Sequence, residues 1–236
     1  MWRLLLLGET DPYANMAVEE GLLRAVEEGD APNTLRLWRS TCSIVIGWSE
    51  KPKETLNLGN CRRLKIPVVR RFTGGGTVYH DLGNLNWTFA LRKEMRDQGK
   101  VMSARETFEK FSSPVLEALR VLGVEASFRE PNSLYVKGGK VSGMAMYVKR
   151  RSVLCHGTLL VDADLSLLEL ALKRLKDPVA NVNDEAPSRL GMEEMAKAIA
   201  EASERRLKVD LVEEGLTVRE RELISSCPLQ KYKPII

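Results

Sequence analysis

Three consecutive glycines, Gly74, Gly75 and Gly76, constrain the fold of this 236-residue chain more than any other feature. They follow a pair of arginines, Arg70 and Arg71, and they separate two segments whose residues favour strand. Glycine permits positive φ and lets backbone N–H groups approach a ligand, while a guanidinium group matches the oxygens of phosphate or carboxylate. The run therefore predicts an anion-binding loop between two strands, and a plain glycine-rich hairpin is the alternative.

No helix is expected to begin at these glycines, because the residues on both sides favour strand. A Walker loop needs Gly-Lys-Ser or Gly-Lys-Thr at the start of a helix, and a dinucleotide fingerprint needs Gly-x-Gly-x-x-Gly there. Neither pattern is present in the run. We therefore expect strand-edge amides and side-chain cations to hold the anion, without the help of a helix dipole.

The composition fits one soluble domain in a reducing compartment. The 36 basic and 32 acidic residues give a net charge of +4, which is too balanced to indicate a nucleic-acid partner. The four cysteines form no Cys-x-x-Cys pair, so neither a disulfide framework nor a zinc site is indicated. No apolar run approaches the roughly 20 residues of a membrane span. We therefore expect a cytoplasmic protein that binds neither nucleic acid nor membrane.

Hydrophobic periodicity predicts strands paired through hairpins, with helices packed around them. Helices are expected at residues 16–28, 54–64, 104–122, 165–175, 192–206 and 211–225. Strands are expected at residues 35–38, 43–47, 85–91, 134–136, 140–145 and 153–161, and on both sides of the glycines. Asn15 is a candidate N-cap of the first helix. The pattern predicts an α+β fold with a mixed, mainly antiparallel sheet flanked by helices, as a single domain over residues 1–236.

Two further glycine-containing segments carry polar residues suited to a ligand. The first, residues 138–143, places Lys140 directly after a Gly-Gly turn, where its ammonium group could reach a buried ligand. The second, residues 155–160, is a predicted strand that carries His156. Taken alone, Lys140 also fits a solvated hairpin lysine and His156 a core histidine. Both histidines of the chain fall in glycine-rich segments, however, and this coincidence favours a functional role.

The three segments together resemble the catalytic domain of lipoate-protein ligases, in the biotin and lipoate ligase superfamily. The matching motifs are Arg-Arg-x-x-Gly-Gly-Gly-x-Val-x-His-Asp-x-Gly-Asn at 70–84, Gly-x-Lys-Val-Ser-Gly at 138–143, and His-Gly-Thr-Leu-Leu-x-x-Ala-Asp-Leu at 156–165. The resemblance covers roughly residues 4–190, and three ordered motifs are more specific than any one of them. It implies the fold of that family and a two-step reaction. ATP activates lipoate or octanoate to an acyl-adenylate, and a lysine of an acceptor domain then takes the acyl group.

The resemblance also implies a role for each motif residue. Lys140 would bridge the acyl carbonyl and the phosphate, and Arg71 would stabilise phosphate charge, so both would be catalytic. Asp81 would contact Mg²⁺, a hard cation that suits a carboxylate. The ligand-binding set would be Arg71, Gly74, Gly75, Gly76, Thr77, Val78, Tyr79, His80, Asn84, Lys140, Ser142, Gly143, His156, Gly157 and Thr158.

The implied partners are lipoate and lipoyl-accepting proteins, namely 2-oxoacid dehydrogenase E2 or glycine cleavage H-type domains. Trp38, Val45 and Gly47 would line a tunnel for the lipoyl chain, or else belong to an ordinary core. Many lipoate ligases carry a C-terminal accessory domain, and this chain leaves little room for one after its final helices. We therefore expect a small separate accessory subunit.

Three alternatives to ATP-dependent ligation are considered. Related octanoyltransferases form an acyl-enzyme on a cysteine, but residues 126–128 contain none at the expected place, and Cys155 lies in an apparent buried strand where a thiol is usually inert. Biotin ligases share the architecture but carry a different basic glycine loop. A non-catalytic nucleotide- or acyl-binding module is the third alternative, against which the intact Arg71, triple glycine and Lys140 argue.

Overall fold

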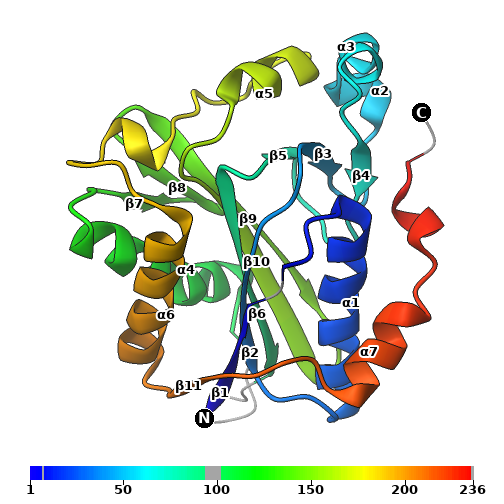
Figure 1. Cartoon of the computed structure of the whole chain (residues 1–236), viewed down its shortest axis with the longest axis vertical. Helices are drawn as coiled ribbons and strands as arrows, with labels where there is room; N and C mark the ends of the chain where they lie inside the picture. The colour runs from blue at the N-terminus through cyan, green and yellow to red at the C-terminus, as the bar shows by residue number, and fades with distance from the viewer. Residues whose placement is uncertain (7, 94–101, 235–236) are drawn as a thin grey trace.

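The computed structural model describes residues 1–6, 8–93 and 102–234. Figure 1 shows a central sheet with helices on both of its faces. Its strands are β1 (Trp2–Leu6), β2 (Thr34–Trp38), β6 (Asn84–Arg92), β7 (Ser127–Arg129), β8 (Ser133–Val136), β9 (Gly139–Val148), β10 (Ser152–Leu160) and β11 (Leu211–Glu213), in the order β11-β1-β2-β6-β10-β9-β8-β7. Within the described residues, β1 pairs in parallel with β2 and β11, and the other neighbours pair antiparallel. The predicted mixed, mainly antiparallel α+β fold is confirmed.

The helices cover the sheet in two groups. One face carries α4 (Ala104–Val121) and α6 (Met192–Leu207), and the other carries α1 (Pro12–Glu28) and α7 (Val218–Ser225), as Figure 1 shows. Because side chains alternate along a strand, Trp87 and Phe89 of β6 join the core beneath α4 and α6. Thr88 points to the opposite face and bonds to helix α1. The α1 face of the central strands is thus the one that carries buried polar groups.

A second, three-stranded sheet holds the glycine run. Its order is β4 (Val68–Arg70), β3 (Ser43–Ile46), β5 (Val78–His80), with β4 parallel and β5 antiparallel to β3. The strands on either side of the glycines therefore do not pair with each other, and the glycine-rich hairpin that was the alternative is wrong. Both strands pair instead with the buried β3, whose Ile44 and Ile46 bury their side chains completely. The glycine loop crosses from one edge of β3 to the other.

The first helix begins earlier than its periodicity predicts. Asp11 is the N-cap, and its carboxylate accepts hydrogen bonds from the N–H groups of Tyr13 and Ala14. Pro12 follows at the first helical position, where its missing N–H costs nothing. Asn15 is therefore not the cap. It is fully buried inside the helix and donates to the carbonyl oxygens of Glu9 and Arg39.

The C-terminal third is less helical than predicted. Residues 211–225 divide into β11 and α7, and the helix predicted at 165–175 is α5 (Leu165–Ala171), which ends four residues early. The remaining short elements are α2 (Pro52–Thr55), α3 (Leu58–Arg63), η2 (Val182–Asp184) and η3 (Leu229–Tyr232). A buried ion pair between Arg3 of β1 and Glu220 of α7 joins the two ends of the chain. Among the described residues, no helix has the length and apolar character needed to cross a membrane.

Candidate functional site

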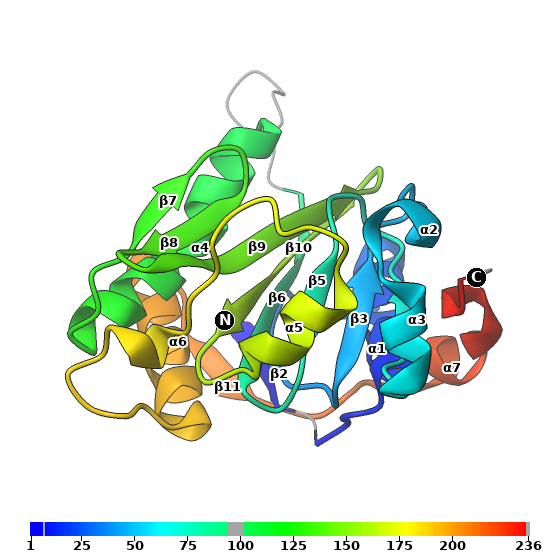
Figure 2. The same cartoon turned by 90° about the horizontal axis from the view of Figure 1, so that it is seen from above.

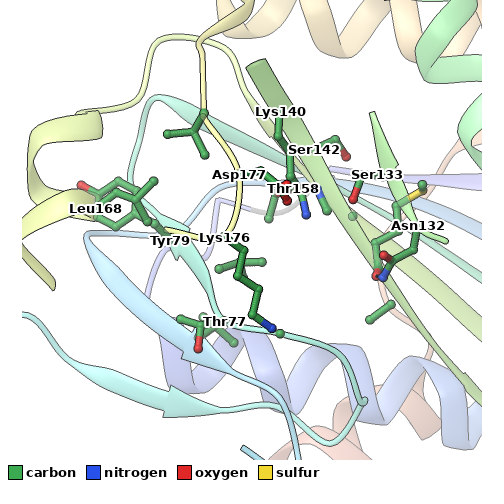
Figure 3. Close-up of a pocket in the computed structure, with 18 of the residues that line it drawn as sticks. Thr77, Tyr79, Asn132, Ser133, Lys140, Ser142, Thr158, Leu168, Lys176 and Asp177 are labelled. Atoms are coloured by element: carbon green, nitrogen blue, oxygen red, sulfur yellow. Dashed lines mark hydrogen bonds between the residues drawn. The ribbon is translucent and has the colours of Figure 1, made fainter. Parts of the chain in front are cut away.

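A cavity of about 760 Å³ lies between the α1 face of the large sheet, the small sheet and the chain that follows α5. Figure 2 shows α5 and the yellow chain after it lying across the strands. The predicted site residues that line the cavity are Arg71, Gly76, Thr77, Val78, Tyr79, His80, Lys140, Ser142, Gly143, His156, Gly157 and Thr158. Gly74, Gly75, Asp81 and Asn84 lie outside the lining. The three motifs, which are spread over residues 70–165 of the chain, thus meet at one cavity (Figure 3).

Arg71 organises the glycine loop from the inside. Its Nη2 donates to the carbonyl oxygens of Gly74 (2.6 Å) and Gly76 (2.7 Å), and its Nη1 donates to the carbonyl oxygen of Val45 (3.1 Å). Burial lowers the pKa of Arg71 to about 10, and the carboxylate of Glu50 opposes that shift, so the side chain is still charged at neutral pH. Since the guanidinium gathers the loop carbonyls on its own side, it gives the loop a fixed shape. Arg71 is therefore a positioning residue for the glycine loop.

Arg70 braces the neighbouring loop. Its Nη1 donates to the carbonyl oxygens of Gly47 (3.0 Å), Trp48 (2.7 Å) and Glu50 (2.9 Å). A Cβ on Gly47 would lie 2.0 Å from the carbonyl oxygen of Gly75, so only glycine allows the two loops to approach this closely. Both arginines of the pair therefore direct donors to backbone carbonyls, whereas the sequence predicted that they face an anion.

A buried hydrogen-bonded chain connects Arg71 with helix α1. Arg71 Nε lies 3.0 Å from Thr73 Oγ1, Thr73 Oγ1 lies 2.9 Å from His156 Nε2, and His156 Nδ1 lies 2.9 Å from Glu19 Oε2. The fully buried Glu19 also accepts from Arg36 Nη1 at 2.9 Å and from Thr88 Oγ1 at 3.0 Å.

The charge of Glu19 sets the direction of this chain. Burial would raise the pKa of Glu19, but the hydrogen bond from His156 and the charge of Arg36 outweigh it and lower the pKa. A charged carboxylate only accepts, so His156 donates from Nδ1 and its Nε2 is left to accept from the Thr73 hydroxyl. Thr73 Oγ1 can then accept from Arg71. One tautomer of His156 thus satisfies every bond in the chain.

Lys140 presents an ammonium group to the cavity. Its backbone is fixed on both sides, since its N–H donates to the carbonyl of Pro178 (2.8 Å) and its carbonyl accepts from Ala180 (3.1 Å). Its Nζ lies 3.5 Å from the place of a Cβ on Gly143 and has no hydrogen bond or ion pair among the described residues. Burial lowers its pKa, nearby Asp177 raises it and Lys176 lowers it. This half-buried cation therefore faces the cavity without a fixed partner (Figure 3).

His80 is a buried neutral imidazole on the cavity wall. Burial is the main cause that lowers its pKa to about 3, and the charge of Arg71 and the neighbouring His156 lower it further. Its ring lies edge-on to Trp38 at 5.6 Å between centroids. Trp38, Val45 and Met16 together form an apolar part of the lining. Trp38 and Val45 thus lie where a tunnel wall was predicted, while Gly47 does not line the cavity.

Asp81, the predicted metal ligand, is occupied with the turn that follows β5. Its carboxylate accepts from the Tyr79 hydroxyl (3.0 Å) and from the N–H groups of Gly83 (2.8 Å) and Asp164 (2.8 Å). The hydrogen bond to Asp164 ties this turn to the start of α5. No group of three or more His, Cys, Asp or Glu side chains that could hold a metal occurs among the residues the structure describes.

Sequence reasoning missed several residues of the site. Glu19 and Arg36 do not line the cavity but support His156 from behind its wall. They gave no signal in the sequence, because they look like the charged positions of an amphipathic helix and a strand. Glu50 accepts from Thr77 Oγ1 at 2.7 Å and lines the cavity, yet it falls in a loop without a motif. Asn86 follows the motif residue Asn84 by one strand period, and the alternation of β6 was the signal that could have found it.

The chain matches the family model described as "Lipoyl protein ligase A/B catalytic domain" over residues 11–204. It is 30% identical over 254 residues to lipoate-protein ligase A subunit 1 of Thermoplasma acidophilum, an alignment that covers 98% of this chain and 93% of the relative. The first curated relatives it matches are longer, and the chain spans about half of their length, from 44% to 54%.

Two solved structures have closely similar folds. A lipoate-protein ligase A bound with ATP superimposes with a TM-score of 0.86 at 28% identity and covers 95% of this chain and 92% of its own. A bipartite lipoate protein ligase of T. acidophilum, described together with its E2 lipoyl domain, gives a TM-score of 0.84 at 28% identity, with 95% and 90% covered.

Proposed function

Because the chain belongs to the lipoyl protein ligase A/B catalytic domain family, we propose that it is an ATP-dependent lipoate-protein ligase. It would join lipoate, or the related octanoate, to a lysine side chain of an acceptor domain through an acyl-adenylate. A relative named as a ligase subunit and a similar structure bound with ATP support the proposal.

The observation that carries the proposal is the position of the Lys140 ammonium group. It faces a cavity with an apolar part formed by Met16, Trp38 and Val45 and a glycine loop that includes Gly76 and Thr77. An acyl chain fits the first part and a phosphate fits the second. An unpartnered cation on the wall of the same cavity stabilises the negative charge that an acid and a phosphate bring together.

In the first step, a carboxylate oxygen of lipoate attacks the α-phosphorus of ATP, and the bond to the diphosphate breaks. The residues of this chain act by position and charge, and none becomes covalently attached. Lys140 would neutralise the carboxylate and the α-phosphate, while the backbone N–H groups of the loop that Arg71 shapes would face the phosphate oxygens. The buried chain from Arg71 to Glu19 would keep this arrangement fixed.

We propose that Mg²⁺ enters with ATP. Mg²⁺ keeps several waters and commonly binds through substrate phosphates and one or two carboxylates, where it screens phosphate charge. The carboxylates on the cavity wall can supply those one or two ligands. Asp177 is close enough to Lys140 to raise its pKa, so it is better placed than Asp81 to approach a phosphate-bound cation.

The acceptor is proposed to be a lipoyl domain of the 2-oxoacid dehydrogenase E2 type or a glycine cleavage H-type protein. The similar bipartite ligase described with its E2 lipoyl domain supports the first class. By the same reasoning, we propose that this chain is the catalytic domain and that it works with a small separate accessory subunit. We also propose, from its four unpaired cysteines, that it acts in the cytoplasm.

The octanoyltransferase alternative requires a nucleophilic thiol at the cavity. None of the four cysteines, all of which lie within the described residues, lines it. Burial raises the pKa of the Cys155 thiol, which packs into the core on the opposite face of the sheet. A thiolate is therefore strongly disfavoured there.

The test is transfer of lipoate to a purified lipoyl domain with ATP and Mg²⁺, measured by intact mass. A parallel reaction supplies octanoyl carrier protein without ATP. Modification that depends on ATP establishes the ligase, and modification from the thioester alone establishes the transferase. If neither reaction proceeds, preformed lipoyl-adenylate separates a missing accessory subunit from a non-catalytic module, because only an enzyme will transfer the acyl group from it.

A further inference from the structure

Asn86 is a buried asparagine whose amide nitrogen has no partner. The residue is 2% exposed, it lines the cavity, and its Nδ2 finds no hydrogen-bond partner among the described residues. An unpaired buried donor costs about 1 to 3 kcal/mol, so native structures rarely keep one without a role. The donor is available to a ligand in the cavity.

A neighbouring asparagine bonds to the carbonyl side of this amide. Asn84 Nδ2 donates to Asn86 Oδ1 at 3.0 Å, which holds the carbonyl side of the Asn86 amide against the wall. Both side chains leave β6 on the same face, because they are two residues apart. The remaining side of the amide, its NH₂ group, is then directed away from Asn84.

The sheet register places Asn86 beside both parts of the proposed acyl site. Asn86 is the cross-strand partner of Trp38 on one side and of Thr158 on the other. Thr158 Oγ1 in turn accepts from the N–H of Gly143 (3.2 Å), and the Lys140 ammonium lies next to Gly143. Since neighbouring strands are about 4.8 Å apart, Asn86 stands between the apolar tunnel wall at Trp38 and the reacting end at Lys140.

We propose that Asn86 is a catalytic residue whose amide NH₂ group donates to the acyl oxygen and stabilises the oxyanion of the transfer step. The inference rests on the proposed function. The acceptor amine reaches the site neutral, having lost a proton to water, and its nitrogen forms a bond to the acyl carbon while the carbonyl electron pair moves to the oxygen. When the carbonyl re-forms, the bond from the acyl carbon to the phosphate oxygen breaks, AMP leaves with that electron pair, and the nitrogen releases its extra proton to solvent.

Lys140 and Asn86 would contribute differently to the two steps of the reaction. The ammonium group neutralises charge on both the phosphate and the acyl oxygen, so it serves adenylation and transfer alike. A neutral amide donor gains most when the oxygen becomes an anion, which happens only in transfer. Asn86 should therefore matter more for the second step than for the first.

The test is single-turnover transfer from preformed lipoyl-adenylate to a lipoyl domain, with Asn86→Leu, which keeps the volume, and Asn86→Ala. We expect a loss of about 10²- to 10³-fold in the transfer rate, as for removal of one oxyanion donor. Binding of a non-reactive acyl-sulfamoyl adenylate analogue should change by less than about 10-fold. Asn33→Leu is the control, because Asn33 bonds to the N–H of Arg92 at the opposite end of β6.

Two results would overturn the assignment. One is transfer at the wild-type rate by either variant. The other is a loss of analogue binding as large as the loss of rate, which would mark a ground-state or structural contact. Circular dichroism and thermal melts identify a variant that does not fold, and the other variant then decides. Failure of the proposed function is a separate result, since the wild-type protein would itself not transfer the acyl group.

Discussion

His156 Nδ1 lies 2.9 Å from Oε2 of Glu19, a carboxylate on helix α1 that is completely shielded from solvent. This contact places a negative charge beneath the cavity and fixes which nitrogen of His156 carries its hydrogen. Arg36 balances the charge from the neighbouring strand β2, with both side chains fully buried. The wall of the cavity is thus supported by an ion pair in the middle of the fold.

Glu19→Gln should destabilise the protein strongly. The substitution leaves Arg36 buried without its counter-charge, and breaking a buried pair in this way costs about 3 to 5 kcal/mol. Urea unfolding at pH 7 measures the loss. Glu20→Gln is the control, because the adjacent Glu20 pairs with Lys231 in a partly exposed position, where such pairs contribute about 1 kcal/mol or less. Equal losses of stability in the two variants would show that the buried pair of Glu19 and Arg36 does not stabilise the fold in this way.

The same pair should make the wild-type protein sensitive to acid. The pKa of Glu19 is lowered in the folded state, so its stabilising contribution is present above the unfolded value of about 4.3 and is lost as the pH falls below it. Stability measured from pH 6 to pH 3 should therefore fall less steeply for Glu19→Gln than for the wild type. Parallel profiles would show that Glu19 does not titrate differently on folding.

Lys140→Met should slow adenylate formation strongly while the fold persists. The ammonium group has no hydrogen bond or ion pair among the described residues, so its removal breaks none, and loss of one electrostatic donor reduces rates by about 10²- to 10³-fold. Diphosphate release with lipoate and ATP measures the first step, and thermal melting verifies the fold. Lys137→Met is the matched control, since Lys137 is the exposed lysine of the same hairpin. A normal rate for Lys140→Met would remove Lys140 from the catalytic residues.

Gly47→Ala should disturb the glycine loop from outside the cavity. The new methyl group would overlap the Gly75 carbonyl, 2.0 Å away, and backbone cannot move aside without shifting the loop. Overpacking of this kind costs about 1 to 3 kcal/mol, and we expect at least a tenfold weaker apparent affinity for ATP. Gly8→Ala, where nothing lies within 4 Å of the added carbon, is the control. Unchanged ATP binding by Gly47→Ala would mean that the loop tolerates displacement.

The sequence predicted the site best where one motif lies on one strand. Lys140 and His156 could be predicted because each belongs to a local glycine-containing pattern, and the register of β9 and β10 brings both to the same cavity. Glu19 could not be predicted, since its partner is 137 residues away and an amphipathic helix shows charges at many positions. The hairpin considered for the glycine run was wrong for the same reason, because β4 and β5 pair with β3, which is distant in the sequence, and not with each other.

The location of the polar motif residues was easier to predict than the groups that their side chains bind. Asp81 and Asn84 are adjacent to the glycine run, yet the carboxylate of Asp81 satisfies a turn and the amide of Asn84 holds Asn86. Arg70 and Arg71 look like anion ligands in the sequence, but in the fold they bind carbonyl oxygens. A motif specifies residue types, while the direction of each donor depends on backbone groups that only the tertiary structure brings near.

His80 should remain neutral throughout the physiological range. Burial, together with the nearby charge of Arg71, lowers its pKa to about 3. Below about pH 6.5 the unfolded chain therefore binds a proton at this histidine, whereas the folded protein does not. Stability should consequently decline as the pH falls from about 6.5 towards 3. The chain has only two histidines, so imidazole resonances in NMR spectra can be assigned with a single His156→Gln variant. We expect the His80 resonances to stay constant above about pH 4. A titration midpoint near 6.5 would show that water reaches the ring, and it would exclude a neutral, fully buried His80 beside Trp38.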